Sequence, residues 1–83
     1  MFFIKLDTLE TVNKLANLCS KYQDYTDVDI THGRYVINGS SVLAVTSLLG
    51  NIVKVVPTNE DKLFQTFFLG ELKAIGGWED KTV

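Results

Sequence analysis

The sequence predicts an α+β fold in which one antiparallel sheet is covered by helices on one face. Four short segments have the alternating or β-branched character of strands, and three others have helical spacing or helix caps. Their order is β-α-β-β-α-β-α, which is typical of an open-faced sandwich. A chain of 83 residues is long enough for one core only. We therefore expect a four-stranded sheet with three helices on one face, in a single domain over residues 1–76 followed by a tail over 77–83.

The first strand is expected at Phe2–Leu6, which is apolar and aromatic apart from one lysine. Asp7 is the expected N-cap of the helix that follows, and Glu10 would complete a capping box. The helix should run for about four turns and end near Gln23-Asp24. Its apolar positions are Leu9, Val12, Leu15, Ala16, Cys19 and Tyr22.

A hairpin is expected next. Tyr25–Thr31 alternates between polar and apolar residues, as a half-buried antiparallel strand does. His32-Gly33-Arg34 should form a tight turn, with the glycine supplying a positive φ. Tyr35–Ile37 would then be the partner strand.

The second half of the chain should contain a short helix, a strand and a longer helix. Ser40 or Ser41 can cap a helix over Val42–Leu49, although its β-branched residues also suit a strand. The fourth strand is expected at Ile52–Val56. Asn59, Glu60 and Asp61 suit the start of the last helix, which Gly76-Gly77 would end. Its apolar stripe consists of Leu63, Phe64, Phe67, Phe68, Leu72 and Ile75. The aromatic residues of the stripe, Phe64, Phe67 and Phe68, are predicted to be core.

Composition argues against several classes of function. The net charge is −2 and basic residues do not cluster, which disfavours nucleic-acid binding. The single cysteine, Cys19, cannot form an internal disulfide, and one Cys with one His supplies no metal site. The apolar N-terminal run is too short for a signal peptide or a membrane span. We expect a cytoplasmic protein that is not an enzyme, needs no cofactor and does not bind a membrane.

One stretch resembles a known family. Asp27–Leu48, DVDITHGRYVINGSSVLAVTSL, is similar to the signature of the bacterial phosphocarrier HPr, a D-I-x-L strand, a Gly turn and a helix of the pattern V-x-x-K-S-I-[ML]-G-[VL]-[ML]-[ST]-L. The resemblance implies the HPr-like fold, whose seventh element is a final helix. The ferredoxin-like fold, which includes small-molecule-binding regulatory modules, shares the first six elements and is the alternative.

The catalytic part of the HPr pattern is missing. HPr proteins carry phosphate on a histidine within G-x-H-A-R-P-A at the start of the first helix, and this position falls at or near Thr8. No His, Arg or Pro stands there, and Asp7 and Glu10 would repel a phosphoryl group. We therefore expect that the phosphocarrier role is lost. Thr8 as a substitute acceptor, or His32 as a displaced phosphohistidine, are the weaker alternatives.

A second site of the family matches in part. Ser41 corresponds to the serine that a dedicated kinase phosphorylates in HPr of Gram-positive bacteria and in a histidine-less paralogue used for catabolite repression. Val42, Leu43 and Thr46 correspond to the docking patch of those proteins, but the flanking lysine is Ser40 here. The resemblance implies a monomeric or weakly dimeric regulatory protein. It would dock through this patch and the start of the first helix, Thr8 and Leu9, on proteins of the sugar phosphotransferase or carbon-regulation network. A simple N-cap role for Ser41 is the alternative.

Overall fold

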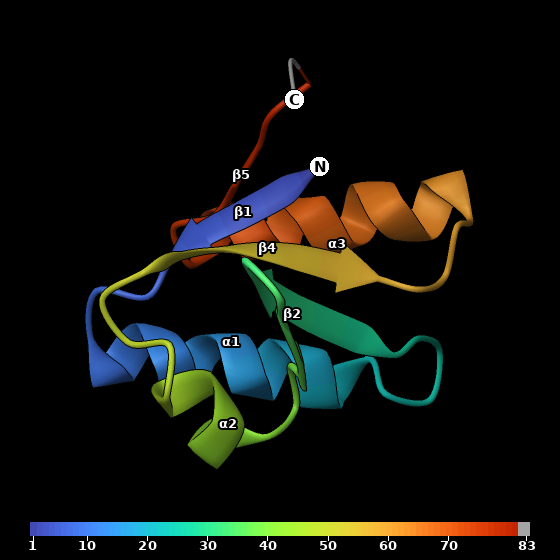
Figure 1. The fold of residues 1–83 in the computed structure, drawn as a ribbon. Coiled ribbons are helices and arrows are strands. Elements are labelled where there is room, and N and C mark those ends of the chain that lie inside the picture. The colour runs from blue at the N-terminus through green and yellow to red at the C-terminus, as the bar shows by residue number, and fades with distance from the viewer. Residues whose placement is uncertain (82–83) are drawn as a thin grey trace.

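A computed structural model describes residues 1–81 and contains three helices and one antiparallel sheet (Figure 1). The helices are α1 (Leu9–Lys21), α2 (Val42–Thr46) and α3 (Lys62–Ala74). The strands are β1 (Phe2–Lys5), β2 (Val28–His32), β3 (Tyr35–Asn38), β4 (Ile52–Pro57) and β5 (Trp78–Glu79). The α+β class and the predicted order of the first seven elements are confirmed. No helix in the described part of the chain is long and apolar enough to cross a membrane.

The strands lie in the order β3-β2-β4-β1-β5, and each neighbouring pair is antiparallel. The hairpin β2–β3 turns tightly at Gly33, which has a φ of 60°. His32 pairs with Tyr35, so it ends β2 and does not lie in the turn where the sequence placed it. A positive φ at the first of two turn residues suits glycine and matches the twist of the strands.

The predicted count of four strands is wrong, because β5 adds a fifth. Phe2 pairs with Glu79 and Phe3 with Trp78, and the rings of Phe3 and Trp78 stack with centroids 6.1 Å apart. The first residues of the predicted tail are therefore part of the sheet, and Trp78 folds back onto this domain. The end of that tail, residues 82–83, lies outside the described residues.

One core joins all three helices to one face of the sheet. Strand side chains alternate, so that Ile4, Ile30 and Val53 are buried whereas their neighbours along each strand are more exposed. The helices contribute Leu15, Val45 and Phe68 among others to the same cluster. Cys19 is buried in this core, as its place on the apolar stripe of α1 predicted.

The apolar stripe of α3 is only partly core. Phe68 and Leu72 are fully buried, and Phe64 packs against the cluster. Phe67 is 62% exposed, so the prediction that it belongs to the core is wrong, and Leu63 of the same stripe is exposed as well. A helix that lies on one side of a sheet buries a limited arc of its surface, and the stripe read from the sequence is wider than that arc.

Candidate functional site

The candidate site lies where α1 begins beside α2. The junction between β1 and α1 is tied to the loop that follows α2, because Leu6 N donates to Asn51 O (2.9 Å) and Gly50 N donates to Leu6 O (2.6 Å). α1 and α2 also pack together, and Figure 1 shows α2 alongside α1. We call the predicted functional residues on these helices the α1/α2 surface. They are Thr8, Leu9, Ser41, Val42, Leu43 and Thr46.

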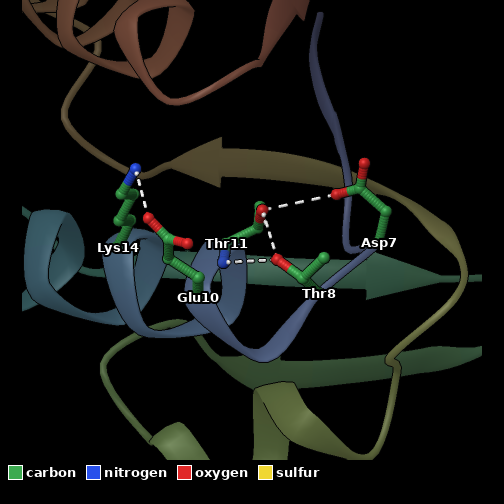
Figure 2. Close-up of polar contacts among 5 residues, drawn as sticks. All are labelled: Asp7, Thr8, Glu10, Thr11 and Lys14. Atoms are coloured by element: carbon green, nitrogen blue, oxygen red, sulfur yellow. Dashed lines mark hydrogen bonds and ion pairs between the residues drawn. The ribbon is translucent and has the colours of Figure 1, made fainter.

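Thr8 is the N-cap of α1, which corrects the expectation that Asp7 would be (Figure 2). Thr8 Oγ1 accepts from Thr11 N (3.2 Å), and its backbone is extended. Thr11 Oγ1 donates to Asp7 Oδ1 (3.3 Å) and lies 3.2 Å from Thr8 Oγ1. Asp7 thus supports the cap through a second hydroxyl instead of capping the backbone itself.

The predicted capping box is also wrong. Glu10 Oε1 forms an ion pair with Lys14 Nζ (3.1 Å), one helical turn further along α1. Both side chains are exposed, so the pair contributes little to stability. The start of α1 therefore presents two exposed carboxylates, Asp7 and Glu10, and a threonine hydroxyl that is engaged in capping. Such a cluster has no imidazole to accept a phosphoryl group and would repel its negative charge.

On α2, Ser41 is the N-cap, one of the two residues that the sequence allowed. Its Oγ accepts from Ala44 N at 3.4 Å, a long bond, and the residue is exposed. The backbone N–H and the hydroxyl of Ser40 both donate to Asn38 Oδ1 (2.9 and 2.8 Å). Ser40 is therefore occupied in the turn, whereas Ser41 projects its hydroxyl at the protein surface.

The apolar members of the α1/α2 surface are exposed. Leu43 is 86% exposed, and Val42 and Leu9 are also exposed. Val45 anchors the helix from its buried side, which leaves the first turn of α2 to solvent. Thr46 is half-buried, and its Oγ1 donates to the carbonyl of Val42 (2.7 Å). The structure thus brings the predicted docking residues at the start of α2 to the surface, on a helix that packs against α1.

The remaining residues considered as functional sites, His32 and Cys19, lie in surroundings that do not suit phosphoryl transfer or nucleophilic chemistry. His32 is half-buried at the end of β2 and lines a hollow of about 390 Å³ with residues of β3 and residues that follow α2. It does not lie at a helix N-terminus, where free N–H groups would bind a phosphoryl group. Burial raises the pKa of the Cys19 thiol to about 12, so it is not a nucleophile near neutral pH. No group of His, Cys, Asp and Glu among residues 1–81 could hold a metal ion.

Sequence reasoning missed a polar cluster between α1 and α3. Glu71 accepts hydrogen bonds from Lys21 Nζ (2.6 Å) and from the hydroxyl of Tyr22. These bonds hold the pKa of the Glu71 carboxyl below its usual range and raise the pKa values of Lys21 and Tyr22. Glu71 is about 50 residues from Lys21 and Tyr22 in the sequence, so no local sequence pattern could predict these hydrogen bonds. The ring of Tyr22 packs on Phe64 and Phe68, which indicates a link between the two helices.

Comparisons with known proteins support the fold. The structure is similar to the crystal structure of HPr-C-His from Thermoanaerobacter tengcongensis, with a TM-score of 0.62 and 17% sequence identity. The match covers 87% of this chain and 89% of the other. No protein-family model matches this sequence, and no curated protein does. At this identity the likeness shows the HPr-like fold and leaves the role of each residue to the site itself.

Proposed function

We propose that this protein is a non-enzymatic, cytoplasmic HPr-like docking protein of the sugar phosphotransferase or carbon-regulation network, without phosphocarrier activity. The observation that carries the proposal is the exposure of Leu43 in the first turn of α2. An apolar side chain of this size costs free energy in water, and burying it against a partner protein recovers that cost. Val42, the preceding residue, is also exposed, and so is Leu9 at the start of α1.

The lost carrier role is supported by the start of α1. By the resemblance to the HPr pattern, the position of the phosphohistidine falls at or near Thr8, and Asp7 and Glu10 stand close to it in the sequence. The Thr8 hydroxyl accepts a bond from Thr11 N, and transfer of phosphate to it would both break the cap and place two negative groups together.

Ser41 is the proposed site of regulatory phosphorylation. Its hydroxyl is exposed and makes a cap bond of 3.4 Å, so a kinase would displace one weak interaction. A phosphate there would add nearly two negative charges beside the exposed Val42 and Leu43. Phosphorylation would therefore change which partners the α1/α2 surface accepts.

Intact mass after two separate incubations tests the loss of carrier activity and the serine site. One incubation contains phosphoenolpyruvate and the general phosphotransferase enzyme, and the other contains ATP and an HPr kinase. We expect one phosphoryl adduct in the second only, absent from Ser41→Ala and retained in the matched control Ser40→Ala. An adduct in the first incubation contradicts the loss of carrier chemistry, and its disappearance in His32→Ala would assign it to His32.

Binding to the same kinase tests the docking surface. We expect Leu43→Asp to weaken binding by about tenfold or more, because it removes an apolar anchor and adds a charge. Leu63→Asp, a matched change at an exposed leucine on α3, should leave binding unchanged. Equal binding of both variants and the native protein would exclude the α1/α2 surface as the docking site.

A further inference from the structure

The edge of the sheet at β3 lacks a charged residue, a proline and a bulge, three features that protect many edge strands. β3 has one strand neighbour, β2, among residues 1–81. Its four residues, Tyr35–Asn38, include no charge, no proline and no bulge, and Tyr35 and Val36 are 69% and 64% exposed. The opposite edge differs, because β5 has only two residues and is followed by charged ones. An exposed, uncharged edge is a template for pairing with another strand.

The backbone groups available at this edge can be identified. Gly39 N donates to Val28 O (2.8 Å), so the odd-numbered positions of this segment bond to β2. Backbone groups of alternate residues in an antiparallel ladder point to the same side. Val36 and Asn38 therefore direct their N–H groups away from β2, off the edge of the sheet. A strand that pairs here would have to meet these two residues.

We propose that β3 pairs antiparallel with β3 of a second copy of this chain, about a two-fold axis perpendicular to the sheet at Val36. This axis places Val36 opposite Val36 of the second copy, with two reciprocal backbone hydrogen bonds. Tyr35 then lies opposite Ile37 of the second copy, and Ile37 opposite Tyr35. Aromatic and β-branched residues are favourable cross-strand partners, so the strand is complementary to itself.

Charges favour a second copy over an unrelated peptide. In this register Arg34 lies opposite Asn38 of the second copy, whose neighbour on β2 is Asp29. Arg34 and Asp29 have no ion-pair or hydrogen-bond partner for their side chains within residues 1–81. The long side chain of Arg34 reaches across β3 of the second copy to Asp29 on its β2. The two-fold axis repeats this Arg34–Asp29 pair, so the dimer has two of them. The dimer thus pairs charges that the monomer leaves unpaired.

A hollow beside the edge completes the fit. It has a volume of about 390 Å³ and lies on the helix-covered side of β3, where Ile37 and Tyr35 line it together with the end of α2. Tyr35 of the second copy stands opposite Ile37 on this same side, so its ring fills the hollow. The two five-stranded sheets become one of ten strands. The residues of the α1/α2 surface lie neither in β3 nor among those that line the hollow, so the pairing and the docking function can be tested by separate substitutions.

Sedimentation equilibrium of the full chain, from about 10 µM to about 1 mM, tests the proposal, since an interface this small forms a weak dimer. We expect a reversible monomer–dimer equilibrium. Val36→Pro removes the outward N–H donor of residue 36 in each copy without touching a bond to β2, and an edge strand tolerates proline there. It should raise the dissociation constant by roughly 10- to 100-fold.

A second substitution tests the same interface without proline, so the result does not depend on whether the proline variant folds. Val36→Lys places two like charges on the axis and should abolish dimerisation, whereas Ile52→Lys, at an exposed β-branched residue of β4, should not. Asp29→Asn should weaken the dimer and reduce its dependence on salt. Circular dichroism checks that each variant is folded. A monomer over the whole range, or a dimer that Val36→Lys leaves intact, overturns the proposal.

Discussion

Gly39 lies buried where β3 leaves the sheet for α2, in direct contact with α1. A Cβ at this position would be 2.7 Å from Cys19 Sγ, a distance at which something must shift, and 3.0 Å from Val28 O, which is tighter than most contacts of a Cβ. Gly39→Ala should therefore lower the free energy of unfolding by about 1–3 kcal/mol, as overpacking does. Urea unfolding followed by circular dichroism measures this change.

A second substitution, at Cys19, tests whether the loss of stability in Gly39→Ala comes from this contact. Cys19→Ala removes the sulfur atom, so the double variant should lose less stability than the two single changes summed. Recovery should be partial, because the carbonyl of Val28 remains 3.0 Å away. An unfolding midpoint of Gly39→Ala equal to that of the native protein would show that the backbone relaxes freely at this point.

Glu71 gives the protein a modest acid sensitivity. Hydrogen bonds from Lys21 and Tyr22 hold the pKa of its carboxyl below the usual value in the folded state. The stability that they provide is complete above the unfolded pKa of about 4.3 and is lost as the pH falls through the lower folded pKa. The side chain is 36% exposed, so the effect should stay below about 1 kcal/mol.

An NMR titration of the Glu71 carboxyl carbon measures this directly. Tyr22→Phe removes one of the two hydrogen bonds and should move the pKa upward, toward its usual value. Tyr35→Phe, a matched change at an exposed tyrosine of β3, should leave the titration unchanged. The assigned role of Tyr22 fails if both variants titrate as the native protein does.

Helix α3 shows that neighbouring residues of one type can differ completely in energetic role. Phe68 is 0% exposed and contacts Phe2 and Tyr22, whereas Phe67 points to solvent. Phe68→Ala should cost about 3–5 kcal/mol of stability, and Phe67→Ala about 0.5 kcal/mol or less. Denaturant unfolding of the two variants checks this, and comparable losses would mean that Phe67 is buried in solution.

At the scale of the whole molecule, the order of elements could be predicted because its signals are local. Gly33 marks a hairpin and Ser41 and Asp61 begin helices, each by contacts within three residues. The choice between Asp7 and Thr8 as a cap could not be made, since both residue types are suitable. β5 was missed because its two residues have no pattern of their own and pair with Phe2 and Phe3, at the other end of the chain.

The same limit applies to the candidate site. The capping role of Ser41 follows from the local sequence, whereas the exposure of Leu43 was expected only from the resemblance to HPr. The link of Glu71 to Tyr22 depends on tertiary packing of two helices, and the unpaired edge at β3 depends on the order of strands in the whole sheet. Features of this kind become visible only when the fold is assembled.

The pairing of β1 with β5 has a mechanical consequence. Met1 and Asp80 exchange two backbone hydrogen bonds, and Phe2 and Glu79 pair next to them. A tension that pulls residues 1 and 80 apart acts across the strands and loads these bonds one at a time, beginning at the end. Such a ladder unzips at low force, in contrast to strands that are sheared along their length. β5 would therefore detach first, at a force that leaves the other four strands paired. Its loss would relieve the tension before the rest of the domain unfolds.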